Sequence, residues 1–68
     1  MMDFGQAWIY LTHQKGAKLR NGNTICTSHD GMHVEVETPD DSDEIVKLNY
    51  SEFGQRFGVN SRFVEVSG

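Results

Sequence analysis

The sequence has few of the residues that usually stabilise a small secreted domain. Its 68 residues include one proline and one cysteine, Cys26. A single cysteine excludes an intramolecular disulfide and is typical of a protein in a reducing compartment. No apolar run approaches the roughly 20 residues of a membrane span, and the Met1-Met2-Asp3 start lacks the features of a signal peptide. We therefore expect a cytoplasmic protein that makes no use of a membrane.

Basic residues are also scarce, since six Lys and Arg stand against ten Asp and Glu, for a net charge of −4. Proteins that bind nucleic acid generally need a basic surface, so direct nucleic-acid binding is not expected. A chain this short buries only about 60% of the surface that its unfolded form exposes. Small domains without disulfides often gain stability from oligomerisation. We expect one domain over residues 1–68 that forms a homo-oligomer.

The opening of the chain has the pattern of a capped helix. Asp3 is a good N-cap, and Gln6 three residues later completes a capping-box pattern. Gly16 stands where a glycine commonly ends a helix. A helix is predicted over residues 4–14. Four apolar residues then share one helical face: Phe4, Ala7, Trp8 and Leu11.

Ile9 and Tyr10 lie off this apolar face of the predicted helix. They are therefore either partly exposed or in contact with a partner subunit, and both are our predicted interface residues. Tyr10 and Tyr50 are the aromatic residues best suited to an exposed or interfacial place, because a phenol can stack and form a hydrogen bond at once.

Short alternating segments separated by turn residues follow the first helix. Asn21-Gly22 is a strong signal for a two-residue hairpin turn. Alternation over residues 32–37 places Met32, Val34 and Val36 toward the core. Strands are predicted over residues 17–20, 24–27, 32–37, 45–48 and 62–66.

A second capping-box pattern, Asn49 with Glu52, begins a short helix that stops at Gly58. The predicted order is α-β-β-β-β-α-β. Strands joined by tight turns are antiparallel, and helices usually cover one face of such a sheet. The predicted fold class is therefore α+β, with a small antiparallel sheet of four to five strands, an N-terminal helix and a second short helix.

Cys26, His29 and His33 have the spacing C-x2-H-x3-H. A turn over residues 28–31 would place Cys26 and His33 opposite each other on the outward face, with His29 beside them, which would suit zinc. The pattern lacks the second ligand pair of a zinc finger. The simpler interpretation is a surface strand that binds no metal, and no cofactor is expected.

An acidic segment over residues 38–44 separates two predicted strands. The simpler interpretation is a solvated loop that keeps a small protein soluble. The alternative is a docking patch for a basic host protein. Its charges are Asp40, Asp41, Asp43 and Glu44.

Motifs of catalysis are missing from the sequence. It contains no Gly-x-Ser-x-Gly elbow, no glycine-rich phosphate loop and no evident pair of nucleophile and base. We therefore expect a protein that is not an enzyme. The candidates for ligand binding are Arg20, beside the predicted Asn-Gly turn, Arg62, at the start of the last strand, Tyr10 and Asn23. An arginine can hold an anionic group by two hydrogen bonds.

The first 20 residues resemble the opening of a family of small phage proteins that includes the Thoeris anti-defence proteins. The resemblance rests on Phe4-Gly5-Gln6-Ala7, Leu11, Gly16 and Lys18-Leu19-Arg20. It implies an oligomer that sequesters a cyclic nucleotide immune signal in pockets between subunits. Arg20 is the polar position carried over from the motif, whereas Tyr10, Asn23 and Arg62 are chosen from their local chemistry.

Two segments depart from the pattern of this family. Asn21-Gly22-Asn23 follows Arg20 where the family usually has a tryptophan, and Ser61-Arg62-Phe63 stands where an acidic residue and a tryptophan are usual. The expected function is that of a non-enzymatic phage-type protein in the host cytoplasm that counters a host defence, with an anionic nucleotide at a subunit interface as the ligand. The alternative is an acidic inhibitor that binds a host enzyme such as a nuclease or polymerase.

Overall fold

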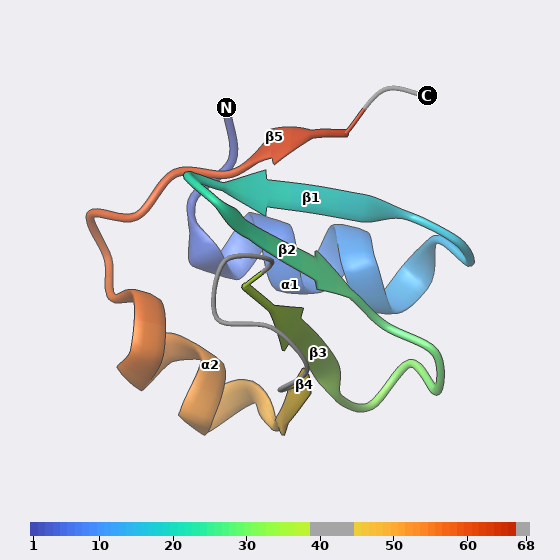
Figure 1. The fold of residues 1–68 in the computed structure, drawn as a ribbon. Coiled ribbons are helices and arrows are strands. Elements are labelled where there is room, and N and C mark those ends of the chain that lie inside the picture. Colours follow the sequence, from blue (N-terminus) through green and yellow to red (C-terminus); the bar gives the residue numbers. More distant parts are fainter. Residues whose placement is uncertain (39–44, 67–68) are drawn as a thin grey trace.

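A computed structural model describes residues 1–38 and 45–66. Within these residues the chain forms two helices and a five-stranded antiparallel sheet, in the predicted α+β order (Figure 1). The acidic residues Asp40, Asp41, Asp43 and Glu44 lie outside the described residues. The elements are α1 (Phe4–His13), β1 (Lys18–Asn21), β2 (Thr24–Thr27), β3 (Val34–Glu37), β4 (Ile45–Leu48), α2 (Tyr50–Phe57) and β5 (Val64–Glu65).

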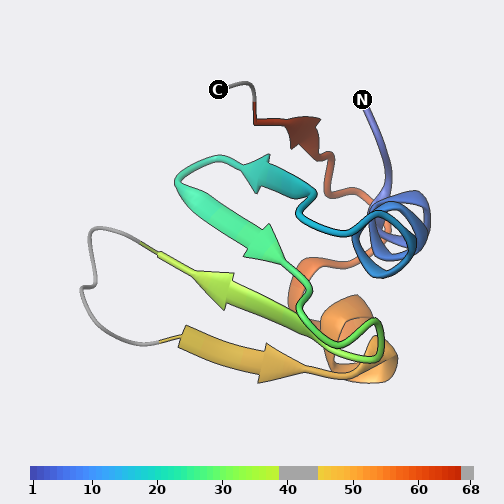
Figure 2. The same cartoon turned by 90° about the vertical axis from the view of Figure 1, so that its right-hand side faces the viewer.

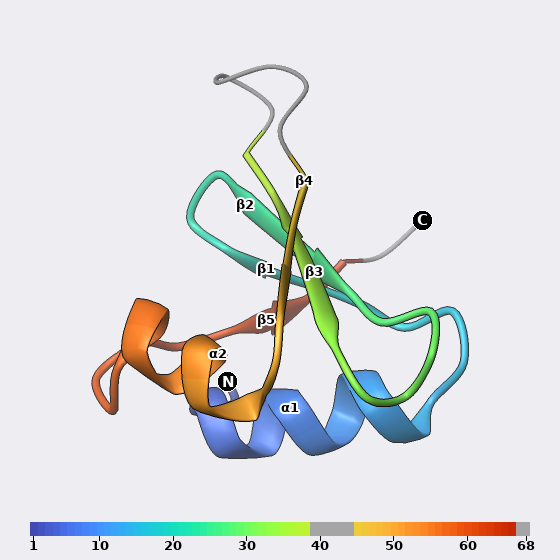
Figure 3. The ribbon, with the colours of Figure 1, turned by 90° about the horizontal axis from the view of Figure 1, so that it is seen from below.

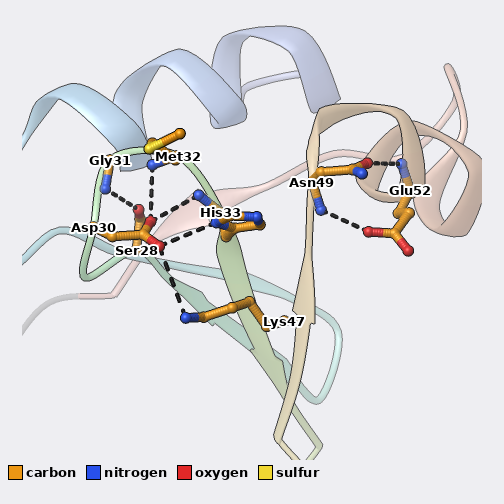
Figure 4. Close-up of polar contacts among 8 residues, drawn as sticks. All are labelled: Ser28, Asp30, Gly31, Met32, His33, Lys47, Asn49 and Glu52. Carbon is orange, nitrogen blue, oxygen red and sulfur yellow. Dashed lines mark hydrogen bonds and ion pairs between the residues drawn. The ribbon is translucent and has the colours of Figure 1, made fainter.

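Both predicted capping boxes are present. The Asp3 carboxylate accepts a 2.8 Å hydrogen bond from the backbone N–H of Gln6, whose side chain accepts one from the N–H of Asp3. Asn49 and Glu52 form the same reciprocal pair at the start of α2 (Figure 4). These bonds satisfy N–H groups that have no partner inside the helix. Each helix therefore begins where its local sequence predicts.

The two helices end differently. Gly58 caps α2 with a φ of +76°, as predicted. Helix α1 ends one residue earlier than predicted, and its C-cap is Gln14 in an extended conformation. Gly16 belongs to the turn that follows, where its φ of +82° favours glycine. The prediction that Gly16 caps α1 was therefore wrong.

The sheet has the strand order β4-β3-β2-β1-β5. In the first hairpin Asn21 pairs with Thr24, so Gly22 and Asn23 form the turn instead of the predicted Asn21 and Gly22. The last strand pairs with β1, and Phe63 beside it forms a bridge to Met2. The N-terminal segment and β5 consequently lie next to each other at one edge of the sheet (Figure 1).

The two helices lie on the same side of the strands (Figures 2 and 3). Strand register shows which residues face them. Leu19, Cys26 and Val36 form one cross-strand row and are buried, as is Val34 in the next row. Met32, predicted to point inward, is 69% exposed, because the strand begins only at Val34.

Aromatic rings join the two helices to the last strand. The rings of Trp8 and Tyr50 meet edge to face with centroids 5.3 Å apart, and Trp8 also contacts Phe53 at 5.7 Å. Phe53 stacks on Phe63 at 5.5 Å, and both rings are fully buried. Such pairs add to the stabilisation that comes from burial. The core thus closes around Phe53, between α1, α2 and the sheet.

Over the described residues, no helix combines the length and the apolar character needed to cross a membrane.

Candidate functional site

Tyr10 lies on the helix side of the sheet. It is half-buried, and its hydroxyl lies beside the carboxylate of Glu65 on the last strand. Desolvation raises the pKa of Tyr10, and the negative charge and hydrogen bond of Glu65 raise it further. The neutral phenol is therefore favoured, and Tyr10 fastens α1 to β5.

Arg20 lies on the opposite face of the sheet. Leu19, the residue before it, points into the core. Because successive side chains of a strand alternate between faces, Arg20 points away from the core. Arg20 is exposed and pairs with Ile25 on one side and Val64 on the other. Lys18 is exposed on the same face, so β1 presents two cations to solvent.

Arg62 and Asn23 lie near the tip of the first hairpin. The Arg62 guanidinium donates 3.0 Å hydrogen bonds to the carbonyls of Val59 and Ser61. The Asn21 amide donates a 2.8 Å hydrogen bond to the carbonyl of Arg62, which fastens this loop to β1. Asn23 is exposed in the turn. Arg62 is thus held by its own loop.

The four predicted ligand residues do not converge within one chain. Tyr10 belongs to the side covered by the helices and Arg20 to the open face, with the sheet between them. An aromatic ring that stacks on a ligand held by Arg20 would have to come from another chain. A site that combines them between subunits stays a prediction.

The meeting of Cys26, His29 and His33 that a turn over residues 28–31 would allow does not occur. Cys26 pairs with Val36 and points into the core, where it is fully buried. Burial raises the pKa of its thiol to about 12. Among the described residues, no group of three or more His, Cys, Asp or Glu side chains is arranged to hold a metal ion. The outward position expected for Cys26 was wrong because residues 28–33 form a longer turn than predicted.

Asp30 organises that turn, a role that the sequence analysis missed (Figure 4). Its carboxylate accepts 2.8 Å hydrogen bonds from the backbone N–H groups of Met32 and His33, and it lies 3.0 Å from Nδ1 of His33 and 3.7 Å from Nζ of Lys47. The N–H bonds, foremost, lower the pKa of Asp30 well below its usual range. The signal was present in Asp30-Gly31, since aspartate before glycine is common in turns.

The outer surface of α1 combines exposed apolar side chains with two neighbouring hollows. Ile9 is 59% exposed and Tyr50 is 51% exposed, and two shallow hollows of about 370 and 520 Å³ share Ile9 and Gln6 as lining residues. We call this the Ile9 surface. The first hollow is completed by Met2, Tyr10, His13 and Gln14, and the second by Asp3, Gly5, Trp8 and Tyr50.

The Ile9 surface is apolar at its centre and polar at its margin. Trp8 and Tyr50 are held against each other, and Asp3 and Gln6 are held by the capping box, so its shape is fixed before any partner binds. The predicted interface residues Ile9 and Tyr10 both line it. Sequence reasoning missed Gln6, whose capping role is the more evident one.

The chain has no significant match to a protein-family model, a curated protein or a solved structure.

Proposed function

We propose that this protein is a non-enzymatic binding protein that engages another protein through the Ile9 surface. The observation that carries the proposal is the exposure of Ile9 between two hollows. A large apolar side chain gains nothing from solvent, and apolar patches edged by polar groups are typical of protein interfaces.

Residue types at this surface suit a protein partner. Tryptophan and tyrosine are enriched among the residues that dominate binding energy, because they combine a large apolar area with a polar group. Each hollow is large enough to accept an apolar side chain of a partner. Gln6 and His13 lie at the margin, where they can pair with polar groups of that partner.

The proposed biological role is to counter a host defence by binding a host protein. This part rests on the resemblance of the first 20 residues to phage anti-defence proteins. The acidic segment over residues 38–44 was considered above as the contact with a host protein. We now propose the Ile9 surface as that contact instead.

Sequestration of a cyclic nucleotide is the second candidate function. The observation that favours it is the pair of exposed cations, Lys18 and Arg20, on one face of β1. They could hold phosphate groups. The base would then stack on an aromatic residue of a second chain.

The test compares two exposed apolar residues replaced by arginine. Ile9→Arg changes the Ile9 surface, and Val59→Arg changes a residue that is 71% exposed in the turn after α2. The tagged proteins are expressed in bacteria that carry a phage-defence system, captured with their partners, and assayed for suppression of that defence.

We expect wild type and Val59→Arg to retain both a stoichiometric partner and suppression, and Ile9→Arg to lose both. Retention of both by a folded Ile9→Arg would contradict the proposal. Thermal melting with added cyclic nucleotides tests the second candidate. A rise in Tm that Arg20→Ala abolishes supports it, and an unchanged Tm rejects it.

A further inference from the structure

The open face of the sheet carries its side chains in two ordered rows. Strand register defines both rows, because directly paired residues point to the same side of a sheet. One row crosses all five strands from β5 to β4: Val64, Arg20, Ile25, Glu37 and Ile45. The other crosses β1 to β4: Lys18, Thr27, Glu35 and Lys47.

Charge in these rows is separated by strand. Both outward positions of β1 are cations, and both outward positions of β3 are anions. Strand β2 lies between them and presents Ile25 and Thr27. The longer row therefore has the order apolar, cation, apolar, anion, apolar. When the row is reversed about Ile25 and laid against itself, each cation therefore faces an anion and each apolar residue faces an apolar residue.

We propose that a second copy of this chain packs on the open face, sheet against sheet, around a twofold axis parallel to β2. The rotation places β1 of each copy over β3 of the other, and β5 over β4. Arg20 then meets Glu37 of the second copy, and Lys18 meets Glu35. Ile25 meets its own symmetry mate, and Val64 meets Ile45.

The charge pattern selects this arrangement over the other simple twofold. An axis perpendicular to the strands would place β1 over β1 and β3 over β3, so that like charges would face each other. Packing with nearly aligned strands is a usual geometry for twisted sheets. A twofold contact also needs a surface that is complementary to itself, which the longer row provides.

Existing contacts leave three of the four required charges without an ion pair among the described residues. Lys47 already lies 3.7 Å from Asp30, and Glu35 lies 3.9 Å from the exposed His29. Among the described residues, Arg20, Lys18 and Glu37 form no ion pair. The exposed fraction of Ile45 is 57%, so it too gains from being covered.

The size of the face sets the expected affinity. Five strands about 4.8 Å apart and four residues of about 3.3 Å each give a face of about 24 by 13 Å. That is small for a specific interface, so we expect a dissociation constant in the micromolar range. The apolar contacts at the centre and ends of the longer row supply most of the affinity, and the ion pairs fix the register.

The experiment exchanges charge between two chains. Arg20→Glu places two acids opposite each other in a homodimer, and Glu37→Arg places two cations opposite each other. Mixed in equal amounts, the two variants regain both ion pairs in a heterodimer. Analytical ultracentrifugation at low ionic strength measures each sample over a range of concentrations, against the 7.7 kDa mass of one chain.

We expect wild type to dimerise, each single variant to dimerise about 100-fold more weakly, and the mixture to recover to within about tenfold of wild type. Lys15→Glu makes the same charge change at an exposed residue in the turn after α1 and should dimerise as wild type does. Circular dichroism melts confirm that every variant is folded.

Three results would overturn the proposal: a wild type that stays monomeric at about 1 mM, a dimer that Arg20→Glu does not weaken, or a mixture that fails to recover. The dimer does not depend on the proposed function, because the Ile9 surface is on the other side of the molecule. Ile9→Arg should therefore dimerise normally even where it loses its partner.

Discussion

The hydroxyl of Tyr10 on α1 lies beside the carboxylate of Glu65 on β5, and desolvation and this carboxylate raise the pKa of the phenol. This contact joins the first helix to the last strand, which consists of two residues and lies at the edge of the sheet. Because Glu65 pairs with the core residue Leu19, the contact also helps to hold β5 against β1. A two-residue strand forms few hydrogen bonds of its own, so the side-chain contact matters for its attachment.

Tyr10→Phe should lower the Tm by a few degrees at pH 7, because the ring is kept and the interaction of the hydroxyl with Glu65 is lost. The pKa of Tyr10 is raised in the folded protein. Its contribution to stability is thus complete below the unfolded pKa of about 10 and is lost as the pH rises through the folded value. The difference in Tm between wild type and Tyr10→Phe should therefore shrink above about pH 10.

Tyr50→Phe is the matched control, since Tyr50 is half exposed on α2. Circular dichroism melts between pH 7 and pH 11 measure both variants. Equal Tm values for wild type and Tyr10→Phe at pH 7 would show that the contact with Glu65 does not hold the edge strand.

Local patterns were sufficient to predict the helix starts and the order of elements. Each capping box depends on two side chains three residues apart, so the sequence contains all that it needs. The hairpin turn was displaced by one residue because Asn21-Gly22 and Gly22-Asn23 both suit a turn. The choice between them depends on pairing Leu19 with Cys26, both of which must face the core.

The start of β3 and the placement of the ligand residues depend on contacts that alternation does not reveal. Polarity alternates from Met32 onward, yet the backbone N–H groups of Met32 and His33 donate to Asp30 and are not available to a strand. The separation of Tyr10 from Arg20 depends on which face of the sheet the helices cover. That is decided by long-range packing, so the candidate site could not be assembled from the sequence alone.

Asp30→Ala should destabilise the protein at pH 7, because it removes the acceptor of the Met32 and His33 N–H groups. The pKa of Asp30 is lowered in the folded protein. Its contribution is therefore present above the unfolded pKa of about 4 and is lost as the pH falls toward the folded value. The difference in Tm between wild type and Asp30→Ala should narrow progressively below about pH 4.

Asp30→Asn separates the charge of Asp30 from its hydrogen bonds. The amide oxygen can still accept from the backbone, so this variant should lie between wild type and Asp30→Ala at pH 7. Thermal melts from pH 7 to pH 2 measure all three proteins. A difference between wild type and Asp30→Ala that stays constant over this range would show that the ionised carboxylate is not what stabilises the turn.

Gly5 and Gly54 occupy equivalent places in two Phe-Gly-Gln segments but have different surroundings. A Cβ at Gly54 would lie 3.0 Å from Cε2 of Phe4, whereas a Cβ at Gly5 would meet Oδ1 of Asp3 at 3.5 Å, an ordinary contact. Gly5→Ala should raise the free energy of unfolding by up to about 0.5 kcal/mol, because alanine favours the helix and Gly5 lies in its first turn. Gly54→Ala should lose that gain, because Phe4 must move away from α2.

Urea unfolding of the two alanine variants measures this difference. The double variant Phe4→Leu with Gly54→Ala serves as the control, because the smaller side chain removes the clash. Gly54→Ala should then be more favourable in the Phe4→Leu protein than in wild type. Equal stabilisation by Gly5→Ala and Gly54→Ala in wild type would show that Phe4 does not restrict the approach of α2.

Cys26 should react slowly in the folded protein. The thiolate is the reactive form, and burial raises the pKa of this thiol to about 12. At pH 8 an alkylating reagent should therefore label native protein far more slowly than protein in urea. Comparable labelling rates in both conditions would mean that the reagent reaches Cys26 without unfolding.

Replacement of Cys26 tests whether its side chain is buried by measuring the free energy of unfolding. Cys26→Ser places a hydroxyl in the buried row between Leu19 and Val36 and should cost about 1–3 kcal/mol in free energy of unfolding, because that hydroxyl leaves water. Cys26→Ala places no polar atom there and is the matched control. Since the two side chains differ by one oxygen, a serine variant as stable as the alanine variant would place Cys26 at a hydrated position and contradict the inward orientation of β2.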